Sequence, residues 1–285
     1  MNDLPPVIVF HRNCLDGRAA AAVARRFEKG KGTYQPLQYG NKLRHSVLGR
    51  RVYILDFALD AEEMKRIKNE ASEVFWFDHH VSNTGLQENL GWGILDISEC
   101  GATLTWKMLY PEEPVPDVLA YVKDKDLWTW QLPNAREITA GLFATYSDRN
   151  FAGLLDADLE RMKRKGIPIL RALDERVVKT IGHGVEIEEP YGLRDIRALV
   201  INAQIDHSDI GALVTKPIAE GGKGLDIAIM FFLRADGRWV HVLRSLRVDC
   251  AQIASNRGGG GHPAAASYVA DMPFPFGDDC LNWPL

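Results

Sequence analysis

The stretch Val74-Phe75-Trp76-Phe77-Asp78-His79-His80 joins four apolar residues directly to a carboxylate and two imidazoles. The apolar part predicts a buried strand of a parallel sheet, because strands covered on both faces form short hydrophobic runs. Three polar groups at the end of such a strand are costly to bury unless they serve a purpose. Carboxylate oxygen and imidazole nitrogen together suit Mn, Fe or Zn, so the stretch predicts a metal site. A polar loop with an incidental histidine pair is the alternative interpretation.

Three further apolar runs are each followed by acidic groups. They are residues 7–10 with His11 and Asp16, residues 52–55 with Asp56, and residues 119–122 with Asp124 and Asp126. The pattern leaves open whether the last run is a strand or a helix. Because ligands bind at the carboxyl ends of parallel strands, we expect the groups that follow the strands to converge on one site.

Helical patterns separate the first three runs. Residues 19–27 are rich in alanine, and residues 61–69 place Met64 and Ile67 on one face, with Asp60 as the expected N-cap. Alternating strands and helices predict parallel β-α units and therefore an α/β domain with a parallel sheet.

A second domain is predicted after the glycines and prolines of residues 182–192. We expect an N-terminal domain over residues 1–185, including a connecting helix pair within residues 151–181, and a smaller mixed α/β domain over residues 192–285. In the second domain, residues 198–201, 226–232 and 239–243 predict strands, with Asp236-Gly237 as a hairpin turn. The active site is expected in the cleft between the domains, a common place for ligands.

Several motifs occur in a fixed order along the chain. They are His11-Arg12-Asn13-Cys14-Leu15-Asp16-Gly17, Leu55-Asp56, Asp78-His79-His80, Asp124-Lys125-Asp126, Arg244-Ser245 and Gly258-Gly259-Gly260-Gly261-His262-Pro263-Ala264-Ala265-Ala266. In this order they resemble the DHH phosphoesterase family, in the subset with a DHH-associated C-terminal domain (the oligoribonuclease and exopolyphosphatase-related type). Each motif is weak alone, but their succession is specific and spans most of the chain.

The resemblance implies hydrolysis of a phosphoester by metal-activated water, without a covalent intermediate. It implies one or two Mn²⁺ ions, with Mg²⁺ or Co²⁺ as alternatives. The implied metal ligands are the bridging Asp56, His11 and Asp16 for one ion, and His79 and Asp124 for the other, with Asp78 assisting. His80 is expected to contact the phosphate or orient a ligand, and the implied catalytic residues are Asp56, Asp78, His79 and His80.

The first motif departs from the family pattern of one histidine and two aspartates, because this chain has His11 but only one aspartate, Asp16. Asn13, Cys14 or water is left to take the place of the missing carboxylate, so occupancy of the second metal site stays open. Arg18 either binds a substrate phosphate through its planar guanidinium or is a solvated residue on the first helical turn.

The glycine run before His262 is either a flexible linker or a phosphate-binding nest of backbone N–H groups. A helix starting near Pro263 would add its N-terminal dipole to such a nest. With the family resemblance, the expected substrate-binding residues are Arg18, His80, Arg244, Gly259, Gly260, Gly261 and His262.

Composition sets limits on the partner. The chain has 285 residues, 46% hydrophobic content and a net charge of −4, which disfavours a general surface for long duplex nucleic acid. Its four cysteines show no paired spacing and predict reduced thiols, and no leader or membrane span is evident, so we expect a cytoplasmic protein without membrane partners. A homodimer stays open.

The sequence therefore predicts a divalent-metal-dependent phosphoesterase acting on short oligonucleotides or small nucleotides. The alternatives are an exopolyphosphatase-like enzyme, a cyclic-dinucleotide phosphodiesterase, or a non-catalytic nucleotide sensor with a degenerate metal site. Trp128 and Trp130 are expected in the core rather than as platforms for base stacking.

Overall fold

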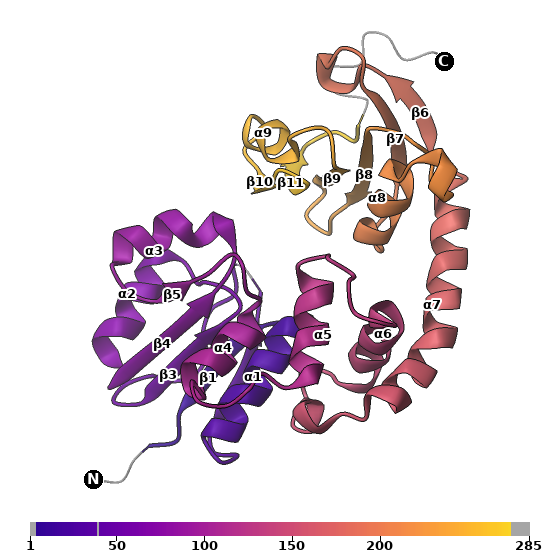
Figure 1. Ribbon diagram of the computed structural model, residues 1–285. Helices are drawn as coiled ribbons and strands as arrows, with labels where there is room; N and C mark the ends of the chain where they lie inside the picture. The colour runs from indigo at the N-terminus through magenta and orange to yellow at the C-terminus, as the bar shows by residue number, and fades with distance from the viewer. Residues whose placement is uncertain (1–3, 39, 275–285) are drawn as a thin grey trace. The chain divides into compact units, whose positions relative to one another are not determined.

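The computed structural model describes residues 4–38 and 40–274. The chain divides into two compact units, Met1–Leu170 and Arg171–Leu285. Each unit contains one β-sheet flanked by helices (Figure 1), which confirms the predicted α/β class.

The first unit contains a five-stranded sheet in the order β2-β1-β3-β4-β5, with every neighbouring pair parallel. Its strands are β1 (Val7–His11), β2 (Thr33–Leu37), β3 (Arg51–Leu55), β4 (Glu73–Asp78) and β5 (Ile94–Leu95). β1, β3 and β4 confirm the three predicted strands. β2 and β5 were not predicted, because β2 is a partly polar edge strand and β5 has only two residues.

Helices follow the strands as the alternating pattern predicted. They are α1 (Leu15–Phe27), α2 (Ala61–Glu70), α3 (Thr84–Leu90), α4 (Gly101–Leu109), α5 (Asp117–Asp126), α6 (Ala135–Thr145) and α7 (Leu159–Ile181), with 3₁₀ turns η1 (Val81–Asn83) and η2 (Leu154–Asp156). Asp60 caps α2 as expected, accepting the backbone N–H of Glu63 at 2.9 Å. The run at residues 119–122, left open between strand and helix, belongs to α5.

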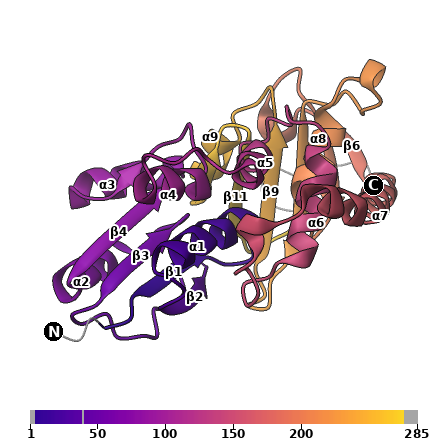
Figure 2. The same ribbon diagram turned by 60° about the horizontal axis from the view of Figure 1, so that its bottom comes forward.

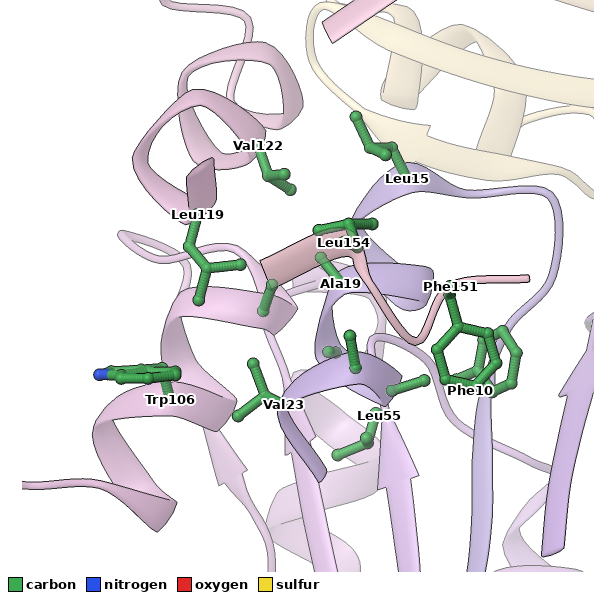
Figure 3. Packing of buried hydrophobic residues seen from close by; sticks show 14 of the residues in the cluster. Phe10, Leu15, Ala19, Val23, Leu55, Trp106, Leu119, Val122, Phe151 and Leu154 are labelled. Carbon is green, nitrogen blue, oxygen red and sulfur yellow. The ribbon is translucent and has the colours of Figure 1, made fainter. Parts of the chain in front are cut away.

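Alternate residues of the strands face opposite sides of the first sheet. On one side, Phe10, Tyr53 and Leu55 pack against α1 and α4, which lie side by side (Figures 2 and 3). On the other side, Val9 and Ile54 pack against α2. Burying each large apolar side chain contributes roughly 1.5–3 kcal/mol, so both faces fix the sheet and the positions of its strand ends.

The long helix α7 is shared between the two units. Met162 packs into the core of the first unit, whereas Leu173, Val177 and Ile181 pack into that of the second. The two units therefore divide within the helix, ahead of the predicted boundary at residues 182–192. The connecting helix pair expected within residues 151–181 is instead the short turn η2 and the single helix α7, which continues through Pro168.

The second unit contains a six-stranded sheet in the order β10-β11-β9-β8-β7-β6, in which only β7 and β8 are parallel. Its elements are β6 (Val185–Glu188), η3 (Pro190–Gly192), β7 (Arg197–Asn202), α8 (His207–Thr215), η4 (Ile218–Glu220), β8 (Ile227–Leu233), β9 (Trp239–Ser245), α9 (Cys250–Ser255), β10 (Gly260–His262) and β11 (Ala265–Ala270). The mixed sheet and the hairpin turn at Asp236-Gly237 confirm the prediction.

The predicted helix near Pro263 is wrong. Pro263 and Ala264 form the turn between the antiparallel strands β10 and β11, and Ala265 and Ala266 pair with β9. The carbonyl of Pro263 accepts the N–H of Cys250, which fixes the turn to α9. Any anion-binding nest here must consist of loop and strand backbone, without a helix dipole.

Among the described residues, no helix combines the length and the apolar character needed to cross a membrane.

Candidate metal centre

Titratable side chains gather at the carboxyl ends of β1, β3 and β4. In three groups, one ligand atom from each of three residues lies within 4.8 Å of the others; the groups are His11, Cys14 and Asp56; Asp56, His79 and His80; and Asp16, His79 and Asp126. The strand ends thus bring together His11, Asp16, Asp56, His79 and His80, the convergence expected of a parallel sheet.

Asp56 occupies the centre of this cluster. It follows β3 directly and has a φ of 64°, a left-handed conformation that aspartate tolerates better than most residues. Its Oδ2 lies 3.4 Å from His11 Nδ1, and its Oδ1 lies 3.1 Å from His79 Nε2. Each oxygen of one buried carboxylate therefore faces a different imidazole, so Asp56 would be able to share one cation with each histidine.

The protonation state of Asp56 follows from these neighbours. Burial alone would raise its pKa, but the hydrogen bonds to His11 and His79 and the charge of His80 hold that pKa well below its usual range. Asp56 is consequently an anion at any physiological pH, ready to bind a cation.

His79 sits between three carboxylates. Besides Asp56, its Nε2 lies 3.3 Å from Asp126 and 3.7 Å from Asp16. Burial alone would lower the pKa of His79, but the hydrogen bond to Asp56 and the charges of Asp16 and Asp126 outweigh it and raise the pKa to about 10. This electrostatic setting strongly favours positive charge.

Asp16 and Asp126 complete the acidic part of the site. Burial and the charge of Asp56 raise the pKa of both carboxyls. Asp16 accepts the N–H groups of Gly101 and Ala102 at 2.6 and 2.8 Å, at the first turn of α4. Three carboxylates with two imidazoles offer oxygen and nitrogen donors that suit divalent cations such as Mn²⁺, Fe²⁺ or Zn²⁺.

Asp78 supports the site from behind. It is fully buried, and its Oδ1 accepts the backbone N–H groups of His79 and His80 and lies 2.8 Å from His80 Nδ1. Its Oδ2 accepts the side-chain amide of Asn83 at 2.6 Å. Asp78 belongs to none of the three ligand groups, and its contacts orient the two histidines that follow it.

The structure places Asp126, and not Asp124, beside His79. Both lie on the last turn of α5, but the carboxylate of Asp124 accepts the hydroxyl of Thr129 at 2.6 Å and the N–H groups of Gln131 and Leu132 at 2.8 and 3.0 Å. Asp124 thus holds the loop after α5, and Asp126, not Asp124, belongs to a candidate ligand group with His79. The hydrogen bonds that use Asp124 become visible only when the loop is folded.

Arg18 is not solvated. Only 5% of it is exposed; its Nε donates to Asp148 at 2.7 Å and its Nη1 to the carbonyl of Tyr146 at 3.1 Å. The guanidinium also stacks on Phe143 at 4.5 Å. Arg18 therefore ties α1 to the loop after α6, which corrects the solvated alternative; its contact with a substrate phosphate stays a prediction.

The predicted phosphate-binding residues of the second unit lie around β10 and the end of β9. Gly261 has a φ of 144°, and a Cβ at Gly259 would meet the carbonyl of Ser267 at 2.2 Å, so both positions require glycine. Arg244 is half-buried and, within the described chain, pairs with no carboxylate; it donates to the carbonyl of Leu243 at 2.9 Å. Burial lowers the pKa of Arg244. Its contact with substrate, like those of residues 259–262, stays a prediction.

Gly101 is a site residue to which the sequence analysis assigned no role. A Cβ there would lie 2.7 Å from Asp56 Cβ and 2.9 Å from Asp16 Oδ2. Only glycine lets the start of α4 approach these carboxylates. No local sequence pattern shows this close approach, because it joins residues far apart in the chain.

Comparison with known proteins supports the fold. No family model matches the chain. An uncharacterised protein of Acanthamoeba polyphaga mimivirus is 22% identical over 315 residues, covering 98% of this chain and 72% of that protein.

Three solved structures resemble most of this chain. A pGpG-specific phosphodiesterase of Vibrio cholerae has a TM-score of 0.54 at 14% identity and covers 95% of this chain and 94% of its own. An exopolyphosphatase-related protein of Bacteroides fragilis has a TM-score of 0.56 at 12% identity, and the match covers 93% of this chain and 86% of that protein. RecJ of Thermus thermophilus in complex with Mn²⁺ has a TM-score of 0.53 at 15% identity, and the match covers 94% of this chain and 50% of RecJ. At these identities the likeness establishes the fold.

Proposed function

From the two-domain fold that this chain shares with the DHH phosphoesterases, we propose that it is a divalent-metal-dependent phosphoesterase. It hydrolyses phosphodiester or phosphomonoester bonds of short oligonucleotides or small nucleotides. The observation that carries the proposal is Asp56, a buried anion whose two oxygens face two imidazoles at the ends of parallel strands.

The cluster provides ligands for two cations. His11 and Asp56 would hold one, and Asp56, Asp16, His79 and Asp126 the other, with Mn²⁺ the expected ion and Mg²⁺ or Co²⁺ as alternatives. When bound, such ions neutralise the phosphate and lower the pKa of water, which supplies the nucleophile. Asp56 would set the spacing between the two sites, because its two oxygens face His11 and His79.

The remaining residues of the cluster position the reacting groups. Asp78 holds the ring of His80 through Nδ1 at 2.8 Å, which fixes the tautomer and the ring plane. We assign His80 to the substrate phosphate on this basis. The N–H groups of Gly101 and Ala102 hold Asp16 in place, so its orientation depends on backbone and not on a mobile side chain.

A pair of tryptophans supports a substrate that contains a base. Trp128 and Trp130 follow Asp126, and their rings lie 4.9 Å apart in an edge-to-face contact. Trp128 is 40% exposed, which overturns the expected place in the core. Both have positive φ values, 57° and 51°, an uncommon and strained conformation for bulky residues. Exposed aromatic rings stack on bases and offer little to inorganic polyphosphate.

Asp124 maintains this loop. Its backbone carbonyl accepts the N–H of Thr129 at 2.9 Å while its carboxylate accepts from residues 129, 131 and 132. The loop that carries the tryptophans is therefore built from the same helical turn that carries Asp126. The exposed ring of Trp128 and the proposed ligand Asp126 would therefore belong to one hydrogen-bonded segment.

The experiment is product analysis by chromatography with manganese present. The panel contains a dinucleotide, a five-residue RNA, a cyclic dinucleotide, adenosine bisphosphate and polyphosphate, each also with chelator. We expect chelator-sensitive turnover of a base-containing substrate, reduced in Trp128→Ala and largely retained in Trp128→Phe. Turnover of polyphosphate alone would favour the exopolyphosphatase alternative, and tight nucleotide binding without turnover would favour the sensor. A homodimer and a cytoplasmic location stay predictions.

A further inference from the structure

Cys14 lies where the first motif lacks a carboxylate. It follows β1 and is the N-cap residue of α1, yet its side chain makes no capping hydrogen bond. Its Sγ lies within 4.8 Å of ligand atoms of His11 and Asp56. The thiol thus lies beside the candidate metal centre and does not cap α1 through a hydrogen bond.

The local backbone brings this thiol to the centre. A Cβ at Gly17 would meet the carbonyl of His11 at 2.4 Å, so glycine allows the first turn of α1 to fold closely onto the end of β1. Cys14 stands between these two elements, and it groups with the Asp56 oxygen and imidazole of the first site rather than with His79 and Asp126.

We propose that Cys14 is the anionic ligand of the ion held by His11 and Asp56, in place of the missing aspartate. The inference rests on the proposed function, because it assumes a cation between these residues. Coordination forms a sulfur–metal bond, and the thiol proton leaves to solvent.

A thiolate makes the two sites chemically unequal. Sulfur, imidazole and one carboxylate favour Zn²⁺, Fe²⁺ or Co²⁺ over Mg²⁺, whereas Asp16, Asp56, Asp126 and His79 offer mainly oxygen and suit Mn²⁺ or Mg²⁺. The protein would then select a softer ion at the first site and a harder ion at the second.

The other described cysteines supply controls. Cys100 is fully buried at the start of α4, and its backbone N–H donates to the hydroxyl of Thr103 at 3.2 Å. It belongs to none of the three ligand groups. Cys250 is buried in the second unit. Cys280 lies outside the described residues. Cys250→Ser is accordingly the matched control for a change at Cys14.

The test is a Co²⁺ titration of the metal-free full-length protein, followed by absorption spectroscopy. Cobalt bound to thiolate gives an intense near-ultraviolet sulfur-to-metal charge-transfer band, while its weaker visible bands report binding by any ligand. We expect the charge-transfer band in the wild type and in Cys250→Ser, and its loss in Cys14→Ser. Cys14→Asp should lack the band, keep two ions and bind Mn²⁺ more tightly at the first site.

The outcomes separate this inference from the proposed function. Visible cobalt bands without a charge-transfer band, or a band that survives in Cys14→Ser, would overturn the cysteine ligand and leave the metal-dependent function standing. Absence of any cobalt binding would overturn both.

Alkylation tests the wild-type protein without any substitution. Iodoacetamide labelling, measured peptide by peptide with mass spectrometry, should be slowed at Cys14 by stoichiometric Zn²⁺ and restored by chelator. An unchanged labelling rate at Cys14, with zinc shown to be bound, would contradict the inference.

Discussion

His79 in the first unit and His241 in the second are both largely buried imidazoles, but their surroundings have opposite electrostatic effects. The neighbouring carboxylates raise the pKa of His79 to about 10. Burial and the charge of Arg257 lower the pKa of His241 to about 4, and its Nε2 accepts the N–H of Phe274 at 2.9 Å.

This difference shows that the two units create opposite electrostatic environments for a buried histidine. The parallel sheet collects aspartates at its carboxyl edge and favours cations there. The mixed sheet presents Arg244 without a carboxylate partner in the described chain and keeps His241 neutral, a setting compatible with an anionic ligand.

Removing the central negative charge should have the largest effect. Asp56→Asn keeps the left-handed conformation, which asparagine tolerates, but cannot bridge two cations. We expect metal-dependent activity to fall by at least about 100-fold, with loss of bound manganese measured by elemental analysis. Asp60→Asn is the control, because asparagine still caps α2. Near-full activity in Asp56→Asn would refute the proposed centre.

Arg18 tests whether an ion pair in the first unit stabilises the fold. Arg18→Met leaves Asp148 without its buried partner, and we expect a loss of about 3–5 kcal/mol in the free energy of unfolding, measured by denaturant titration. Arg26→Met, on the exposed side of the same helix, should cost less than about 1 kcal/mol. Unchanged stability with a raised KM would instead support the predicted phosphate-binding role of Arg18.

The two histidines predict opposite pH dependences of stability in the chelated protein. The contribution of His79, whose pKa is raised from 6.5 to about 10, is fully present below pH 6.5 and is lost as pH rises through about 10. That of His241, whose pKa is lowered from 6.5 to about 4, is present above pH 6.5 and is lost as pH falls through about 4, at most about 3 kcal/mol.

The measurement is thermal unfolding against pH for the wild type, His79→Gln and His241→Gln. The difference between wild type and His79→Gln should shrink toward alkaline pH, and that for His241→Gln toward acidic pH. Parallel curves across the range would show that the contrast between the two sites is not electrostatic.

His262 tests the anion-binding role of the second unit and should give the smallest effect. His262→Ala should raise KM about 10-fold, because one hydrogen bond to a charged group contributes about 1.5–3 kcal/mol. Metal content should not change. His183→Ala, an exposed histidine of the same unit, is the control. Loss of metal in His262→Ala would place that residue at the metal centre instead.

The sequence by itself determined where the parallel strands end and which polar groups follow them. Short apolar runs fixed β1, β3 and β4, and His11, Asp56 and Asp78-His79-His80 come directly after or at their ends. Since parallel strands share one carboxyl edge, local pattern was enough to gather these residues. Asp60 and the Asp236-Gly237 turn were predictable for the same reason, because caps and turns depend on adjacent residues.

Only the tertiary structure decided which of several nearby groups faces the centre. Asp124 and Asp126 are separated by one residue, and the choice depends on the loop that wraps around Asp124. Arg18 is committed to Asp148, which lies 130 residues away in sequence, and Pro263 forms a turn because the alanines after it pair with β9. The place of Cys14 beside Asp56 likewise comes from packing, since side-chain direction and long-range contacts are properties of the folded chain that no local pattern encodes.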